Sequence, residues 1–534
     1  MFDFDFDHLM IPPLSFNIVG FGSVGGLAFA IALRRQLKCE DFIIFEKASD
    51  VGGTWRDNRY PGCSSDIAMH FYSLSTDLKA DWESTHEYAP VINEYWAALA
   101  RKYELYSRTA FNTNVTSAAW DATAQVYRIE TENLKTGEKT VTTAQILVSA
   151  IGVLEVPRFP SIPGLEDFKG AVFHSARWDS MVNLENKQVG VIGNGASATQ
   201  FVPIISRKPG ISVTQFSRTP NWVSPPLKAK ISGLWIWAFK HIPGLTRLYR
   251  WRVYFQSDVL YLVFASRFIR WLTMQSCKQY IRKTAPKEYQ EHLIPNYPLG
   301  CKRILFDTDY LDALHRDNLG LNWDGIEEIT ADGIVTKTGH KIPLDVLILA
   351  TGFDTDSFPV SIQGTRNSIQ EYFDTHGAPR AYLGTTVPGF PNFFTIGGPN
   401  TATGHTSVIF TEEVQIDYSL QLIKPVLEGK VSSFEVQDEP TDAYNEKIQN
   451  RLSKSVFVQC QSWYRKGGDG INNSIFPGSQ FRFWWWLRRP NWSHYTVVNG
   501  SAWLQERRAA KQRTVMAVIC GIVGLAAFYV LKRG

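Results

Sequence analysis

Two glycine-rich turns, each placed directly after a short apolar run, constrain this chain more than any other feature. The first turn reads Gly20-x-Gly22-x-x-Gly25, the second reads Gly193-x-Gly195, and an apolar stretch of helical character follows each of them. A strand, a glycine-rich turn and a helix in this order form the βαβ unit that places a pyrophosphate at the N-terminus of the helix. We therefore predict an α/β fold with two Rossmann-like dinucleotide-binding domains.

The end of the second strand in the first unit predicts which dinucleotide binds there. That strand is expected over residues 41–45 and ends at Glu46. A carboxylate at this position accepts a hydrogen bond from a ribose hydroxyl and repels a 2′-phosphate, so the unit suits FAD or NAD rather than NADP. Within the turn, Gly20 permits a tight bend, Gly22 lets the backbone approach the pyrophosphate, and Gly25 allows close packing of helix and strand.

The second unit carries a cation where the first carries an acid. Its next strand, expected over residues 213–216, is followed one residue later by Arg218 and Thr219. An arginine at this strand end suits a 2′-phosphate and predicts a preference for NADPH over NADH, although a merely solvated arginine is the alternative. The candidate contacts in this unit are Gly193, Gly195, Ser197, Arg218 and Thr219.

Two further apolar runs end in small residues and mark where the chain is expected to cross between the domains. They span residues 146–152 and 346–353, and a proline-rich stretch follows the first one. An FAD domain that is interrupted by an inserted NADPH domain accounts for both crossings. The predicted divisions are residues 1–152 and 351–505 for the discontinuous FAD domain, 153–350 for the NADPH domain, and 227–297 for a helical insert within it.

Composition excludes several classes of partner. The net charge of +4 is too small to favour nucleic acid. None of the six cysteines forms a Cys-x-x-Cys motif or a Cys/His cluster with zinc spacing, so a reducing compartment and no metal are expected. Aromatic residues make up 13% of the chain, which suits a large apolar ligand cavity, a membrane surface or simply a tryptophan-rich core.

The C-terminal stretch differs from the rest of the chain. Residues 514–531 carry no charge and lie between Arg513 and the pair Lys532-Arg533. That length is the short end of a membrane-spanning helix, and a single-pass anchor is favoured over a docked or dimerising helix. Because the first ten residues do not have the character of a signal peptide, the catalytic part is expected in the cytosol, with the endoplasmic reticulum as the first candidate membrane.

A basic and aromatic segment at residues 227–283 has two open interpretations. It contains 11 lysine and arginine residues and one acid, Asp258, with aromatic residues between them. Its longest apolar run, residues 259–265, is too short to cross a bilayer. The segment is expected to form helices that either lie in a membrane interface or pack over the active site.

Three sequence phrases resemble those of one enzyme family. The first runs Phe168-x-Gly170-x-x-x-His174-x-x-x-Trp178-Asp179 and lies just upstream of the second glycine-rich turn. The other two are Gly52-Gly53-Thr54-Trp55 with Tyr60-Pro61-Gly62 and Asp66, and Gly398-Pro399-Asn400-Thr401 with Gly404-His405 and Glu413. Together with the two turns, they resemble the type I Baeyer–Villiger monooxygenases, a group of class B flavoprotein monooxygenases, over most of residues 15–500.

That resemblance implies a reaction that depends on FAD and NADPH. One atom of O₂ is inserted beside a ketone through a flavin C4a-peroxide, and the product is an ester or a lactone. The resemblance implies that Arg303 stabilises the peroxide anion and that Asp66 orients Arg303. It also implies that Lys302 binds the NADPH 2′-phosphate together with Arg218 and Thr219.

Other residues of the phrases have less specific expectations. Thr54, Trp55 and Tyr60 are expected beside the flavin, although core packing explains the two aromatic side chains equally well. In the family, His174 belongs to the linker that coordinates domain motion, so a role as acid or base is not favoured. Trp178 is expected to be structural.

Three alternative functions were weighed against this one. The nearest is a flavin-containing monooxygenase that oxygenates sulfur or nitrogen, which uses a protonated hydroperoxide and does not require Arg303. A flavin-dependent disulfide reductase is disfavoured because no Cys-x-x-Cys motif is present. A membrane-bound scaffold is disfavoured because both glycine-rich motifs and Arg303 are intact. The aromatic content and the apolar C-terminus favour a lipophilic ketone as substrate.

Overall fold

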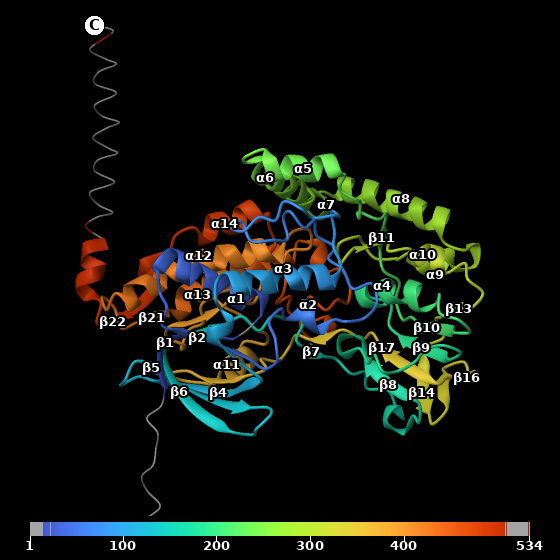
Figure 1. The fold of residues 1–534 in the computed structure, drawn as a ribbon, viewed down its shortest axis with the longest axis horizontal. Coiled ribbons are helices and arrows are strands. Elements are labelled where there is room, and N and C mark those ends of the chain that lie inside the picture. Colours follow the sequence, from blue (N-terminus) through green and yellow to red (C-terminus); the bar gives the residue numbers. More distant parts are fainter. Residues whose placement is uncertain (1–13, 22, 508, 510–531, 533–534) are drawn as a thin grey trace, which may run out of the picture.

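The computed structural model describes residues 14–21, 23–507, 509 and 532. Two sheets lie side by side, and helices α5 to α8 form an outer layer along one edge of the molecule (Figure 1). The first sheet has eight strands and the second has five. The α/β class predicted from the two βαβ units is therefore confirmed.

The first sheet combines a parallel part with an antiparallel part. β1 (Leu14–Phe21) lies between β2 (Phe42–Glu46) and β6 (Lys139–Ser149), and both pairings are parallel. The carboxyl ends of these strands therefore meet at one edge, beside the first glycine-rich turn. The strand order is β19 (Ser361–Gln363), β4 (Thr113–Asp121), β5 (Val126–Asn133), β6, β1, β2 and β3 (Thr109–Phe111), with β20 (Phe393–Thr395) also paired to β6.

The first helix of the chain begins at the first glycine-rich turn. α1 (Val24–Ala32) follows Ser23, whose hydroxyl accepts a hydrogen bond from the backbone N–H of Gly25 at 3.1 Å. The first eight positions of α1 are all buried, as expected for a helix that packs on the sheet and also contacts α3 (Ala89–Lys102) and α12 (Val408–Leu427). The chain continues from α1 as a π-helical turn over Leu33–Leu37.

The second sheet is entirely parallel. β9 (Gln188–Ile192) leads through the second glycine-rich turn into α4 (Ala196–Ile205), which packs fully buried apolar side chains against the sheet. Its strand order is β13 (Leu319–Asn322), β10 (Ser212–Phe216), β9, β17 (Val346–Leu349) and β8 (Ala171–His174).

The two crossings of the chain between the sheets lie together. β7 (Val156–Pro157) and β18 (Phe353–Asp354) pair antiparallel, with Phe353 opposite Pro157. Every strand of the second sheet falls between them in the sequence. From this order we propose that the FAD domain is interrupted and that the NADPH domain is inserted, with the divisions expected from the sequence.

The basic and aromatic segment forms the outer helical layer. Its helices are α5 (Gly233–His241), α6 (Leu245–Val259), α7 (Tyr261–Ala265) and α8 (Arg267–Thr284). In Figure 1 these helices run along the top of the molecule. They lie above α1, α3 and α12, which accompany the first sheet, and above α4, which accompanies the second. The insert therefore spans both halves of the structure.

Smaller elements complete the described chain. A short parallel pair joins β11 (Val223–Ser224) to β12 (Leu305–Phe306). The other helices are α2 (Thr54–Asp57), α9 (Gln290–Leu293), α10 (Tyr310–Ala313), α11 (Ile369–Thr375), α13 (Asp438–Leu452) and α14 (Gln480–Leu487). The other strands are β14 (Ile326–Thr330), β15 (Gly333–Thr336), β16 (Lys341–Pro343), β21 (Ser433–Val436) and β22 (Tyr495–Val498).

One cysteine pair was not anticipated from the sequence. Cys301 and Cys460 form a disulfide across a sequence separation of 159 residues. The cysteine spacing, from which a reducing compartment was expected, did not indicate this bond. The two cysteines belong to segments that meet only in the folded chain.

The described residues contain no helix that is both long enough and apolar enough to cross a membrane. The span predicted at residues 514–531 lies outside the described residues, and so does Gly22 of the first turn. The single-pass anchor therefore stays a prediction from the sequence.

Candidate active site

Arg303 and Asp66 are in direct contact. Asp66 belongs to the first-sheet part of the chain, and Arg303 lies just after the helical insert in the sequence. The Arg303 Nη2 donates to Asp66 Oδ2 at 2.6 Å, and Nε donates to the same oxygen at 3.0 Å. Burial opposes the charge on Arg303, but the Asp66 carboxylate outweighs that effect and raises the pKa of the guanidinium. Arg303 is therefore a fixed cation, held in one orientation by a carboxylate that is 237 residues away in the sequence.

The turn that presents Arg303 requires a glycine. Gly300 has a φ of +96°, and a Cβ atom there would come within 2.5 Å of the Phe264 ring of α7. Phe264 also stacks on Phe457 at a centroid distance of 5.1 Å. The disulfide at Cys301 and this aromatic contact hold both sides of the turn, so the position of Arg303 depends on the helical insert.

Lys302, Arg218 and Thr219, which the family resemblance implied as one group, lie close together in the structure. Lys302 Nζ donates to Thr219 Oγ1 at 2.8 Å. Burial lowers the pKa of Lys302, and the nearby Arg218 guanidinium lowers it further. Two cations that repel one another beside a hydroxyl form a site that an anion would stabilise, since its charge removes the repulsion.

The second glycine-rich turn is shaped for a close backbone approach. Gly193 has a φ of +111°, and a Cβ there would come within 2.4 Å of the Ala350 carbonyl oxygen. A Cβ at Gly195 would meet nothing within 4 Å, so open space lies beside this residue at the start of α4. Asn194, which sequence reasoning did not select, donates from Nδ2 to the Thr219 carbonyl at 2.9 Å and ties the turn to the cationic cluster.

The first dinucleotide unit ends in a buried acid. Glu46 closes β2 and is 5% exposed, and burial raises the pKa of its carboxyl. The Glu46 Oε1 accepts from the Ala48 backbone N–H at 2.9 Å and lies 3.3 Å from Arg56 Nη1. Arg56 was not selected from the sequence, because an arginine ten residues beyond the strand carries no local sign of this pairing. Open space lies beside Gly20, where a Cβ would meet nothing within 4 Å.

A buried acid that sequence reasoning did not select lies against the same unit. A Cβ at Gly25 would come within 3.2 Å of the Glu412 carboxyl of α12. The Glu412 Oε2 is enclosed and has no hydrogen-bond partner among the described residues. Burial and the neighbouring Glu413 raise the pKa of Glu412 to about 8.

Tyr60 joins the two halves of the molecule. Its hydroxyl donates to Gln200 Oε1 of α4 at 2.9 Å, and Gln200 Nε2 donates to the Ser64 carbonyl at 3.1 Å. Burial raises the pKa of Tyr60 well above its ordinary value, and Ser197 hydrogen-bonds to the same side chain. Ser197 therefore lies at the contact between the halves, and Gln200 is a further contact residue that no motif revealed.

Thr54 and Trp55 begin α2 directly after two glycines. The Thr54 hydroxyl accepts a hydrogen bond from Asn58 Nδ2 at 2.9 Å. The Trp55 ring packs edge-on to Tyr72 at a centroid distance of 5.6 Å. Tyr72 in turn interacts electrostatically with Arg303, so Trp55 lies in the same neighbourhood as the Arg303–Asp66 pair.

His174 and Trp178 have structural surroundings. His174 ends β8, is 1% exposed, and burial lowers its pKa to about 4, so the imidazole is neutral near pH 7. Its ring lies between Phe159 and Phe353 of the two crossings, at centroid distances of 5.8 and 6.0 Å. Trp178 packs against Phe173 and Phe201, each at 5.2 Å.

One ion pair and one contact between a carboxylate and an imidazole connect the helical insert to the rest of the site. Arg250 of α6 is buried, lies 3.2 Å from Glu413 through Nη2, and donates to the Ser73 carbonyl at 2.7 Å. Asp258 Oδ1 lies 3.5 Å from Nε2 of the buried His405. The one acid of the segment and one of its arginines therefore face inward and fix the insert in place.

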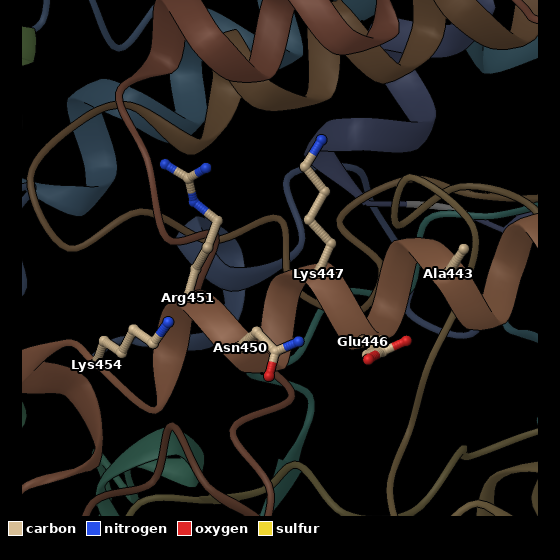
Figure 2. A pocket seen from close by; sticks show the side chains of 6 residues that line it. All are labelled: Ala443, Glu446, Lys447, Asn450, Arg451 and Lys454. Carbon is tan, nitrogen blue, oxygen red and sulfur yellow. The ribbon is translucent and has the colours of Figure 1, made fainter.

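A surface depression elsewhere has no connection with these residues. It lies along α13, has a volume of about 380 Å³, and is lined by residues of that helix and by Lys454 just beyond its end (Figure 2). Lys447 and Arg451 point to the same side, and the Lys447 Nζ lies 4.1 Å from the Trp486 ring centre. The described residues also contain no group of three or more His, Cys, Asp or Glu side chains placed to hold a metal ion.

Known proteins resemble this chain both in sequence and in fold. A sequence profile of the flavin-binding monooxygenase-like family matches residues 15–364. A Baeyer–Villiger monooxygenase of Pseudomonas aeruginosa is 36% identical over 472 residues, which cover 87% of this chain and 88% of that protein. The FAD-binding monooxygenase ktnD of Aspergillus niger is 33% identical over 533 residues, which cover 95% of this chain and 87% of that protein.

A solved structure extends the likeness to the fold. The closed crystal structure of cyclohexanone monooxygenase aligns with a TM-score of 0.80 and covers 91% of this chain and 99% of that chain. The two sequences are 24% identical, so this comparison speaks for the fold.

Proposed function

This chain belongs to the flavin-binding monooxygenase-like family, and on that premise we propose that it is an FAD- and NADPH-dependent Baeyer–Villiger monooxygenase. It inserts one oxygen atom of O₂ beside a ketone carbonyl and forms an ester or a lactone. The bound cofactors supply the electrons and the activation of oxygen. The observation that carries the proposal is the Arg303–Asp66 pair beside the cationic cluster of Lys302 and Arg218.

Arg303 supplies the positive charge that this reaction needs. Insertion of oxygen beside a ketone develops negative charge on oxygen, and a preorganised cation lowers the free energy of that state. Asp66 engages Nε and Nη2 of Arg303, and within the described residues Nη1 makes no hydrogen bond. The guanidinium is thus oriented by one edge while it retains donors for the reacting oxygen.

The residues of each turn fit the cofactor proposed for it. Open space beside Gly20, the N-terminus of α1 and the acid Glu46 suit FAD. Open space beside Gly195 and the mutually repelling Lys302 and Arg218 suit the pyrophosphate and the 2′-phosphate of NADPH. The residues proposed to contact FAD are Gly20, Gly22, Gly25, Glu46, Thr54, Trp55, Tyr60 and Asp66, and those proposed to contact NADPH are Gly193, Gly195, Ser197, Arg218, Thr219 and Lys302.

The substrate is proposed to be a lipophilic ketone. The support is the aromatic content of 13%, together with the uncharged run at residues 514–531. On the same ground the enzyme is proposed to be attached to a membrane by its C-terminal segment, with its catalytic part in the cytosol and the endoplasmic reticulum as the first candidate.

Product analysis tests the proposed reaction. Purified FAD-loaded protein receives NADPH, ¹⁸O-labelled dioxygen, and a panel of lipophilic ketones and thioethers, and the products are identified by mass spectrometry. We expect an ester or lactone that carries one labelled oxygen, and we expect Arg303→Ala to abolish it. Sulfoxide formation without an ester from any ketone would contradict the proposal and assign the chain to the monooxygenases that oxygenate sulfur or nitrogen.

A further inference from the structure

One side of α6 presents a continuous apolar stripe to solvent. Its members are Leu248, Trp251, Phe255 and Val259, whose side chains are 67%, 51%, 62% and 61% exposed. Spacings of three and four residues place all four on one face of the helix. A helix that packs only against its own protein has polar residues on its outer face, so this stripe is unusual.

Three other helices, α5, α8 and α14, carry further exposed apolar side chains. The backbone N–H of Gln480, the first residue of α14, donates to Asp258 Oδ1 of α6 at 2.6 Å, so the exposed end of α6 adjoins the start of α14. We call the exposed apolar side chains of these four helices the aromatic face. Beyond α6 its members are Leu234, Trp235 and Trp237 of α5, Phe268, Trp271 and Leu272 of α8, and Phe481, Trp484 and Trp485 of α14.

The aromatic face does not result from loose packing of the insert. The opposite side of α6 is buried through Arg250, Val253 and Tyr254, and Arg250 is held by Glu413 and by three backbone carbonyls. Tyr254 packs against Phe71 and Phe410 at centroid distances of 5.7 and 5.1 Å. The insert therefore covers the catalytic part with one side and leaves the other side uncovered.

The charge around the aromatic face is positive. Asp258, the only acid between residues 228 and 283, faces inward to His405. Arg247 of α6 and Arg267 of α8 have no ion-pair partner among the described residues, and Arg252 lies over the Tyr249 ring rather than beside an acid. Aromatic side chains interleaved with unpaired cations match the boundary of a bilayer, where rings lie at the headgroup level and cations meet anionic lipids.

We propose that the aromatic face binds the surface of a bilayer that contains anionic phospholipids. Burial of several large side chains at the acyl boundary supplies the apolar part of the free energy, and the cations are attracted to the anionic headgroups. A second copy of the chain fits this surface less well, because two such faces would bring like charges together. This attachment is independent of the predicted C-terminal anchor and of the proposed reaction.

A site-specific probe on the full chain tests the proposal and separates the face from the C-terminus. Phe255→Cys is labelled with an environment-sensitive fluorophore, and Leu134→Cys, at an exposed residue directly after β5, is the matched control. Figure 1 shows β5 low in the molecule and α6 at its top. Unmutated protein that has been treated with the fluorophore provides the blank for the native cysteines. The vesicles are phosphatidylcholine alone or phosphatidylcholine with phosphatidylserine, and flotation measures how much protein is bound.

We expect a blue shift at position 255 with the anionic vesicles, a smaller shift with neutral vesicles, and none at position 134. High salt should weaken the shift. Flotation without a shift at position 255 would overturn the proposal, because another segment would then hold the vesicle, and so would a failure to float. A shift that depends on protein concentration without vesicles would overturn it in favour of self-association.

A charge-introducing variant gives a second, label-free measurement. Trp251→Glu combined with Phe255→Glu should weaken binding to anionic vesicles about ten-fold or more, since two interfacial anchors are lost and two acids are added. Leu134→Glu combined with Met181→Glu changes two exposed apolar residues elsewhere and should leave binding within about two-fold. Equal binding by both double variants would overturn the proposal, provided both retain the melting temperature of the unmutated protein.

Discussion

The two glycine-rich turns begin alike and end in opposite surroundings. In the first unit, Glu46 is 5% exposed, is paired with Arg56, and lies in the interior of the fold. In the second unit, Arg218 and Thr219 are exposed, and Lys302 reaches them from a distant part of the chain. A buried acceptor suits a cofactor that remains bound throughout the cycle, and an exposed cationic cluster suits one that binds and leaves in each turnover.

The loss of Arg303, which pairs with Asp66, should have the largest effect. Arg303→Ala should lower ester formation by about 100-fold or more, since it removes the cation from a site where charge develops. FAD content, measured by the flavin absorbance of the purified protein, should stay unchanged because neither glycine-rich turn is altered. Arg303→Lys keeps the charge but not the fork of donors, so its rate of ester formation should lie between that of Arg303→Ala and that of the unmutated enzyme. Ester yield within two-fold of the unmutated enzyme would remove Arg303 from the proposed chemistry.

Arg218→Ala tests the exposed cluster of the second unit. The apparent KM for NADPH should rise about 10- to 100-fold, the range of one hydrogen bond to a charged group, whereas the KM for NADH should change little. Arg207→Ala is the matched control, because Arg207 is an exposed arginine of the same half that lies 3.7 Å from Asp309. If NADPH and NADH are affected equally, the 2′-phosphate does not bind at Arg218.

Glu46→Gln tests the buried end of the first unit. The change weakens the proposed acceptor of the FAD ribose and removes one charge beside Arg56, so the dissociation constant for FAD should rise about ten-fold. The KM for NADPH should not change, which would sharpen the contrast between the units. Glu40→Gln, at an exposed acid just before the same strand, provides the control. Retention of FAD equal to that of the control would show that Glu46 is structural.

Glu412→Gln should have the smallest effect, which is a change in how the stability of the fold depends on pH. The carboxyl of Glu412 has a pKa of about 8 in the folded protein, where it lies against Gly25, compared with 4.5 when unperturbed. Between these pH values the folded protein keeps a proton that the unfolded chain has released. The stabilising contribution is therefore complete below the unfolded pKa and is lost as pH rises through 8.

The melting temperature should accordingly fall by a few degrees between pH 6 and pH 9, and Glu412→Gln should flatten this dependence. Glu428→Gln, at an exposed acid just beyond the end of the same helix, should leave the slope unchanged. An identical slope in Glu412→Gln and the unmutated protein would mean that other groups cause the pH dependence.

Local patterns predicted the parts of the fold that depend on neighbours in the sequence. The strands around Gly20 and Gly193, the acid at Glu46 and the helical character of the insert all follow from periodicity and turn chemistry within short stretches. The contact between Asp66 and Arg303 and that between Lys302 and Thr219 were implied by family resemblance and are present in the structure. The roles of these residues stay predictions.

The remaining contacts join segments with no common local pattern. Arg250 meets Glu413, Asp258 meets His405, and Cys301 meets Cys460, all across more than a hundred residues. One sequence by itself carries no signal for such pairs, because the residues around each member do not indicate which distant residue it contacts. The same reason explains why Gln200, which joins the two halves, and Asn194, which ties the second turn to the cationic cluster, were not selected.

The antiparallel pairing of β7 with β18 has a consequence for how such a molecule is assembled. The chain leaves the first sheet and returns to it at adjacent points, with Val156 opposite Asp354. The intervening segment therefore begins and ends at one place, as a module does that has been spliced into a host at a single surface loop. Excising it would leave ends close enough to be rejoined by a short linker, and its own new termini would already lie side by side.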